Sequence, residues 1–204
     1  MALITSGTSS SNYCFRCVYK RLFMKIDCGP CAIRSWQYGD ENHLHIHADN
    51  KAIWLNLRDS FPHPYTPTNA RLWIEYVVDP EVETNFAIDV GGEAVGNVGL
   101  RIGTDIERYS AELWYWLGQA HWGNGIVSAA LRVLTDYAFT QLKLSRLYAQ
   151  PMAHNAASIR VLEKAGFRRE GILRDSIVKN GVFMDTVLYA YLSSDWLADG
   201  NELL

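Results

Sequence analysis

The segment that most constrains the fold is a strand that ends at a glycine-rich junction with a long helix. Residues 110–117 have the length and composition of a strand, and Gly118 bounds them. Gly123-Asn124-Gly125 follows, and apolar side chains then recur at a helical period to about residue 142. Glycines at such a junction let backbone amides point into one small space, and the helix N-terminus adds partial positive charge. The junction therefore favours binding of a phosphate group.

The junction does not identify the ligand by itself. Gly-x-Gly also occurs in many tight turns, so the spacing alone is weak evidence. The segment lacks the lysine-and-hydroxyl ending of a P-loop and the third glycine of the dinucleotide-binding fingerprint. Neither of those two ligand classes is favoured.

The order of predicted elements places this junction in an α+β domain. Asp40 is expected to cap one helix, and Thr66-Pro67 to begin another whose apolar side holds Leu72, Trp73, Tyr76 and Val77. Asn180-Gly181 is a strong hairpin signal between the last two strands. The pattern predicts strands over 32–36, 86–90, 94–100, 110–117, 146–151, 168–179 and 182–192, and helices over 40–48, 51–57, from 66, over 125–142 and from 155. Such a meander followed by a helix is typical of a mixed sheet.

Composition narrows the classes of function. The chain has 204 residues, 49% hydrophobic and 20% charged, which suits a single globular domain. Its formal net charge of -3 argues against nucleic acid as the main partner. Because no run of 18 apolar residues and no secretory signal occur, we expect a cytoplasmic protein with no membrane partner. Residues 1–24 are predicted to be an N-terminal extension, either a transit segment or the result of a start placed too early, before Met24.

Four cysteines form two pairs near the N-terminus, Cys14 with Cys17 and Cys28 with Cys31. Two such pairs can hold a tetrahedral zinc, although ten residues between them is short for the usual ribbon. Cys28-Gly29-Pro30-Cys31 also spells a redox dithiol, but that chemistry requires a helix after the first cysteine, and residues 32–34 favour a strand. We expect reduced, structurally passive thiols and no metal.

Two ordered motifs resemble one family. The first is Tyr115-Trp116-Leu117-Gly118 followed by residues 122–131, WGNGIVSAAL. The second is residues 155–167, NAASIRVLEKAGF, followed by Glu170-Gly171. Together they are similar to the acetyl-CoA segments of the GNAT superfamily of N-acetyltransferases, in its RimJ/RimL-like, ribosomal-protein branch. The resemblance covers roughly residues 27–192 and implies a GNAT domain over 25–204. Its fold would be a mixed, mostly antiparallel central sheet flanked by helices and splayed between the fourth and fifth strands.

The resemblance also implies a set of acetyl-CoA contacts. Main-chain groups of Trp116 and Leu117 would pair with the pantetheine arm, and Asn155 would hydrogen-bond that arm. Ser158 would face the sulfur and protonate the departing thiolate, directly or through water. The loop that would hold the pyrophosphate comprises Trp122, Gly123, Asn124, Gly125, Ile126 and Val127. Trp122, Val127 and Ala129 depart from the family's usual residues, but a valine still presents a backbone amide.

A general base is needed because an ammonium has no lone pair with which to attack. Glu112, on the strand where related enzymes often carry a glutamate, is the candidate. The alternative for Glu112 is a solvent-facing or salt-bridged strand residue. His121 is a second titratable group beside the loop, and we interpret it as a loop residue.

Three functions remain open from the sequence. The first is transfer of acetyl from acetyl-CoA to a primary amine, either a protein N-terminus or a small molecule, by direct attack and without a covalent enzyme intermediate. The second is a non-catalytic acyl-CoA-binding or sensing module, which needs no base. The third is a zinc-stapled interaction protein. A homodimer is expected only from family habit.

Overall fold

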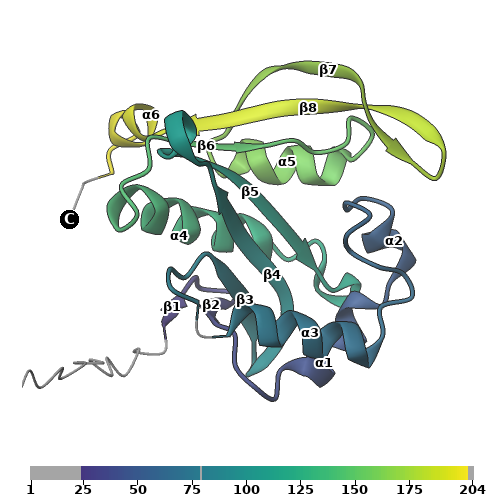
Figure 1. Ribbon diagram of the computed structural model, residues 1–204. Helices are drawn as coiled ribbons and strands as arrows, with labels where there is room; N and C mark the ends of the chain where they lie inside the picture. The colour runs from purple at the N-terminus through teal and green to yellow at the C-terminus, as the bar shows by residue number, and fades with distance from the viewer. Residues whose placement is uncertain (1–23, 79, 202–204) are drawn as a thin grey trace, which may run out of the picture.

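The structure is a computed structural model that describes residues 24–78 and 80–201. In this part of the chain, eight strands form a single sheet with helices on both faces (Figure 1). The strands are β1 (Lys25–Asp27), β2 (Ala32–Ser35), β3 (Asn85–Val90), β4 (Glu93–Ile102), β5 (Ser110–Leu117), β6 (Arg146–Ala149), β7 (Arg168–Lys179) and β8 (Val182–Leu192). The α-helices are α1 (Glu41–Ala48), α2 (Lys51–Trp54), α3 (Pro67–Val77), α4 (Ile126–Thr140), α5 (Ala156–Lys164) and α6 (Ser193–Ala198). The α+β class predicted from the sequence is confirmed.

The sheet opens beside β5. Its strand order is β1-β2-β3-β4-β5-β6-β8-β7, and every neighbouring pair is antiparallel except β5 with β6. The parallel pairing stops at Glu112 opposite Tyr148, whereas β5 continues to Leu117. Among the described strands, residues 113–117 therefore pair only with β4, and their other edge is open. This is the splay expected between the fourth and fifth predicted strands.

Side chains alternate across the two faces of β5 and so separate two halves of the core. Leu113 and Leu117 belong to the cluster that packs with α4. Trp114 and Trp116 belong to the cluster formed with α1 and α3. Glu112 shares the face of Trp114 and Trp116, whereas Tyr115 shares that of α4. The open strand thus presents different chemistry to each side.

Local signals account for several element ends. The Thr66 side chain accepts from Asn69 N–H in a capping box that starts α3. Asn180 and Gly181 have φ of +52° and +77°, the left-handed conformations that a tight hairpin turn requires between β7 and β8. Gly166 ends α5 with φ of +92°, as predicted. The sequence pattern missed β1 and α6, which are short.

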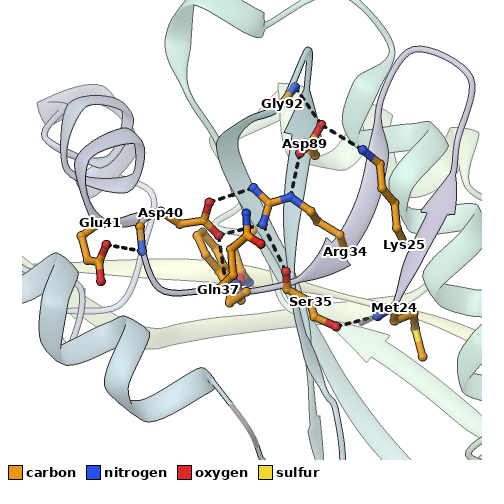
Figure 2. A network of polar contacts seen from close by, with 12 residues as sticks. Met24, Lys25, Arg34, Ser35, Gln37, Asp40, Glu41, Asp89 and Gly92 are labelled. Carbon is orange, nitrogen blue, oxygen red and sulfur yellow. Dashed lines mark hydrogen bonds and ion pairs between the residues drawn. The ribbon is translucent and has the colours of Figure 1, made fainter. Parts of the chain in front are cut away.

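Asp40 occupies the N-cap position of α1, but its side chain does not cap the helix. Instead it accepts two hydrogen bonds from the buried Arg34 guanidinium, at 2.7 and 2.8 Å, as Figure 2 shows. Arg34 also donates to Asp89 Oδ2 at 2.7 Å. The expected N-cap position of Asp40 is therefore confirmed, but its side chain does not cap the helix, because a buried arginine on β2 uses the same carboxylate.

The predicted apolar side of α3 is also partly wrong. The helix buries Ala70, Ile74 and Val77, whereas Leu72 and Tyr76 are 55% and 74% exposed. Leu72 and Tyr76 line a cavity instead of the core. In the described residues, no helix has the length and apolar character needed to cross a membrane.

Candidate active site

A cavity of about 1510 Å³ lies along the open edge of β5 and the start of α4. It brings together every residue predicted to act in catalysis or cofactor binding: Glu112, Trp116, Leu117, Trp122, Gly123, Asn124, Gly125, Ile126, Val127, Asn155 and Ser158. His121 and the half-buried Trp73 and Trp114 line it as well. Their convergence is a property of the fold, and the individual roles stay predictions.

The loop before α4 forms an open cradle of amides. Gly123 and Gly125 have φ of +80° and +73°, and a Cβ built on either would meet nothing within 4 Å. The first main-chain bond of α4 runs from Ala129 N–H to the Gly125 carbonyl at 3.1 Å. The amides of residues 126–128 therefore lack intrahelical acceptors. Together with the dipole of a 15-residue helix, they fit an anionic group such as a pyrophosphate.

The main-chain direction in β5 determines which groups face the open edge. Ser110 O accepts from Gly103 N–H, and Gly118 N–H donates to Val95 O, so even-numbered residues direct their main-chain groups toward β4. Odd-numbered residues direct theirs toward the cavity. Trp116, opposite Asn97 in the ladder, therefore faces β4, and the open-edge groups belong to Tyr115 and Leu117. This geometry argues against the main-chain role expected of Trp116.

Trp122 closes part of that edge. Its indole Nε1 donates to the Leu117 carbonyl at 2.7 Å. The Asn124 side chain donates to the His121 carbonyl at 3.3 Å and braces the same loop. His121 packs edge-on against His47, with 5.3 Å between ring centroids. His121 ends a one-turn 3-10 helix, Gln119–His121, and its interpretation as a residue without a catalytic role stays a prediction.

The Ser158 hydroxyl lies in the first turn of α5 and meets a tyrosine. Asn155 caps α5, with its Oδ1 accepting from Ser158 N–H at 3.1 Å. The hydroxyl oxygens of Tyr115 and Ser158 are 2.7 Å apart. Burial raises the pKa of Tyr115 to about 12, although the bond to Ser158 acts in the opposite direction. The phenol is therefore neutral at physiological pH, and the serine hydroxyl has a fixed partner.

Glu112 forms ion pairs with two arginines. Arg58 Nη2 lies 2.5 Å from its Oε1, and Arg101 Nη2 donates to its Oε2. Glu112 is thus a salt-bridged strand residue in the structure, which was the alternative to its role as a base. A role as base would require one of these partners to move.

Sequence reasoning missed three residues of this cavity: Arg58, Arg101 and Tyr115. Tyr115 lies inside the first matched motif, so its position was visible but its partner was not. Arg101 is directly opposite Glu112 in the ladder, which a correct β4–β5 register would have revealed. No local pattern marks Arg58.

The structure describes only two of the four cysteines on which the zinc and redox hypotheses depend. Cys14 and Cys17 lie outside the described residues. Cys28 and Cys31 flank the turn between β1 and β2, and their thiols are free. Among the described residues, no three His, Cys, Asp or Glu side chains gather as a metal site requires.

Comparison with known proteins supports the match of motifs. The family model "Acetyltransferase (GNAT) domain" matches residues 32–168. A probable N-acetyltransferase of Bacillus subtilis, YjcK, is 48% identical over 86 residues, which are 42% of this chain and 48% of that protein. The chain thus spans about half the length of this relative.

Solved structures share the fold. RimJ of Mycobacterium smegmatis, in complex with a CoA-disulfide, superposes with a TM-score of 0.74 at 22% identity, covering 87% of this chain and 94% of that one. Spermidine N-acetyltransferase of Vibrio cholerae, in complex with CoA and spermine, gives a TM-score of 0.69 at 25% identity, over 82% and 98%. The family model covers more than half of the chain and the fold agrees, so this protein belongs to the GNAT acetyltransferase family.

Proposed function

We propose that the protein is an N-acetyltransferase that moves acetyl from acetyl-CoA to a primary amine by direct attack. The observation that carries the proposal is the open amide cradle of Gly123 and Gly125 beside the unpaired edge of β5. A pyrophosphate on the cradle and an extended arm along the edge would bring a thioester toward Ser158. Acetyl-CoA would supply an already activated acyl group, so no enzyme nucleophile is required.

Different residues would bind different parts of acetyl-CoA. Amides of residues 123–127 would hold the pyrophosphate, and the main-chain groups of Tyr115 and the N–H of Leu117 would pair with the pantetheine arm, since the Leu117 carbonyl already accepts from Trp122. The Asn155 side chain uses its oxygen to cap α5, so its Nδ2 group is the donor for that arm. These assignments follow the direction of the main-chain groups and shift one expected contact from Trp116 to Tyr115.

Two side chains would carry out the two proton transfers of the reaction. Ser158 would give a proton to the departing thiolate, and its contact with the neutral Tyr115 hydroxyl would orient it. Glu112 would take the proton of the attacking ammonium, directly or through water. Positioned acid–base groups of this kind typically contribute about 10²- to 10⁴-fold to a rate.

The second candidate is a non-catalytic acyl-CoA-binding module, because both carboxylate oxygens of Glu112 have arginine partners. Glu112→Gln separates the two functions. If the protein is an acetyltransferase, this variant should still bind acetyl-CoA but release CoA at least about 100-fold more slowly with an amine present. A binding module predicts no amine-dependent release from the unmodified protein at all.

A further inference from the structure

Three charged side chains meet in the cavity: Glu112, Arg58 and Arg101. The Glu112 side chain is only 10% exposed, whereas those of Arg58 and Arg101 are 64% and 65% exposed. The carboxylate is held inside, and both guanidinium groups extend from it into accessible space. A guanidinium has five N–H donors, and each arginine uses one nitrogen on Glu112. The arginine pair, Arg58 and Arg101, therefore has donors to offer a ligand.

The backbone fixes the position of each arginine. Arg101 stands directly opposite Glu112 in the β4–β5 ladder, so the two side chains share a face of the sheet. Arg58 lies in the loop after α2. The buried Lys179 ammonium donates to Leu57 O at 3.0 Å and pairs with Asp59 Oδ1 at 2.7 Å, so it binds the residues on both sides of Arg58.

These bonds tie the loop to the far end of the β7–β8 hairpin, which curls toward α2 in Figure 1. Lys179 also lies 4.2 Å from the centre of the Trp54 ring on α2. Lys179 of β7 thus contacts both the loop that carries Arg58 and the helix that precedes this loop. Arg58 is presented from a braced position, which distinguishes it from an ordinary surface arginine.

The charge balance of the cavity is positive. Of the described residues that line it, Glu112 is the only Asp or Glu, whereas Arg58, Arg101, Arg160 and Lys164 are cationic. Arg160 and Lys164 lie on α5, beside the groove assigned to CoA, whose phosphates can offset them. On the face of Glu112, two guanidinium groups oppose one carboxylate. A polycationic acceptor would meet like charge there.

The same face offers an apolar wall. The rings of Trp73 and Trp114 meet edge to face with 5.6 Å between centroids, and Leu72 and Tyr76 line the cavity from α3. Trp114 is two residues from Glu112 on β5, so both side chains point to one face. The surface thus combines one acid, two arginines and an apolar contact area.

We propose that the arginine pair binds a carboxylate of the amine acceptor, and that the site prefers acceptors with a carboxylate near the amine over polyamines. This rests on the proposed acetyl transfer. The carboxylate has two possible sources with the same chemistry: the main-chain carboxylate of a free amino acid, or an acidic side chain at the second position of a peptide. Arginine binds carboxylates well because its planar fork can donate two parallel hydrogen bonds.

Binding would exchange ion-pair partners. When the acceptor carboxylate takes over one guanidinium, one Glu112 oxygen loses its partner and becomes available to the acceptor ammonium. The attraction between ammonium and Glu112 then replaces the bond that was lost. The acceptor would thereby release the base that deprotonates it, whereas a neutral or polycationic amine would leave Glu112 bound to both arginines.

The test compares matched acceptors on the purified full chain at saturating acetyl-CoA. CoA release is measured for leucine against leucinamide, for Ser-Asp-Leu-amide against Ser-Asn-Leu-amide, and for spermidine. The variants are Arg58→Gln, Arg101→Gln and the double variant. Arg71→Gln is the matched control, because Arg71 on α3 has the same 65% exposure and does not line the cavity. A second readout is calorimetric binding of each acceptor to the protein saturated with unreactive CoA.

In each pair, leucine and Ser-Asp-Leu-amide are the carboxylate members, and leucinamide and Ser-Asn-Leu-amide are their amide partners. We expect at least one carboxylate member to have a KM at least about tenfold below that of its amide partner and of spermidine. The preference should fall below about twofold in the double variant and stay unchanged in Arg71→Gln. The pair that shows it identifies the source of the carboxylate. If amides or spermidine react equally well or better, acetyl transfer stands and this inference is overturned.

The binding readout separates the two claims when no acceptor reacts. Arginine-dependent binding of a carboxylate member to the CoA complex would then support the subsite while the proposed transfer fails. If neither carboxylate member binds more tightly than its amide, the inference is overturned whatever the rates are.

Discussion

The hydroxyl oxygens of Tyr115 and Ser158 lie 2.7 Å apart, although 43 positions separate the residues in sequence. The phenol comes from the open strand β5, and the serine from the first turn of α5. The Tyr115 hydroxyl also lies 3.2 Å from the Ser158 carbonyl, so it contacts both the side chain and the backbone of the serine. The proposed acid, Ser158, is therefore positioned by a residue of β5, on the other side of the opening in the sheet.

Tyr115→Phe should lower kcat while leaving the KM for acetyl-CoA within about twofold. Loss of one neutral hydrogen bond is worth about 1 kcal/mol, which corresponds to about five- to tenfold in rate. Because both residues act through one contact, the effects of Tyr115→Phe and Ser158→Ala on kcat should not add. Initial rates of CoA release measure both. Tyr191→Phe, which removes a hydroxyl bonded to Asp199 at 2.6 Å, is the control, and an equal fall there would contradict the positioning role.

Gly125→Ala should weaken acetyl-CoA binding about tenfold. The new methyl group would occupy the open side of the amide cradle, where the phosphate is expected to form charge-assisted bonds. Left-handed strain should also cost about 1 to 2 kcal/mol of stability. Gly181→Ala is the matched control, because its φ of +77° and open surroundings resemble those of Gly125. Calorimetry should find a lower affinity only in Gly125→Ala, and equal affinities would argue against the cradle.

Arg34→Met should destabilise the fold by about 3 to 5 kcal/mol, because it leaves the Asp40 and Asp89 carboxylates without their buried cation (Figure 2). Lys25→Met, which removes a half-exposed ammonium 3.7 Å from Asp89, should cost less than about 1 kcal/mol. Urea denaturation of both variants measures the difference. Similar costs for the two would mean that Arg34 is not the essential partner.

The same network predicts loss of stability in acid. Burial alone would raise the pKa of Asp89, but hydrogen bonds from Arg34 and Gly92 N–H hold it below its ordinary value. The carboxylate therefore contributes stability above its unfolded pKa of about 3.9, and this contribution is lost as pH falls through the lower folded pKa. Asp89→Asn should show a shallower fall in the free energy of unfolding below about pH 4. An unchanged slope would remove Asp89 from the acid response.

Local patterns were enough to predict the elements that carry strong turn and capping signals. The bounds of β5 coincide with the prediction, in which Gly118 bounds the strand. Asn155 caps α5, and Asn180-Gly181 turns the last hairpin, since these residues favour such conformations whatever their surroundings. The loop before α4 was predictable for the same reason.

The rest of the site depends on contacts that no local pattern encodes. Arg58 reaches Glu112 across 54 positions, and its place depends on Lys179, more than 100 positions further along the chain. Leu72 and Tyr76 have a helical apolar spacing, but the sequence does not reveal that a cavity lies beside them instead of a core. Asp40 carries a capping residue type, yet Arg34 uses its carboxylate. The part of the cavity proposed to bind the acceptor is therefore visible only in the folded chain.

The decisive experiment on acetyl transfer is titration with acetyl-CoA, followed by measurement of amine-dependent CoA release. We expect micromolar binding and release that requires an amine, with binding weakened in Gly125→Ala and release at least about 100-fold slower in Glu112→Gln. Binding without release for any amine would contradict the assignment as a transferase. No binding at all would mean that the glycine loop before α4 is only a turn.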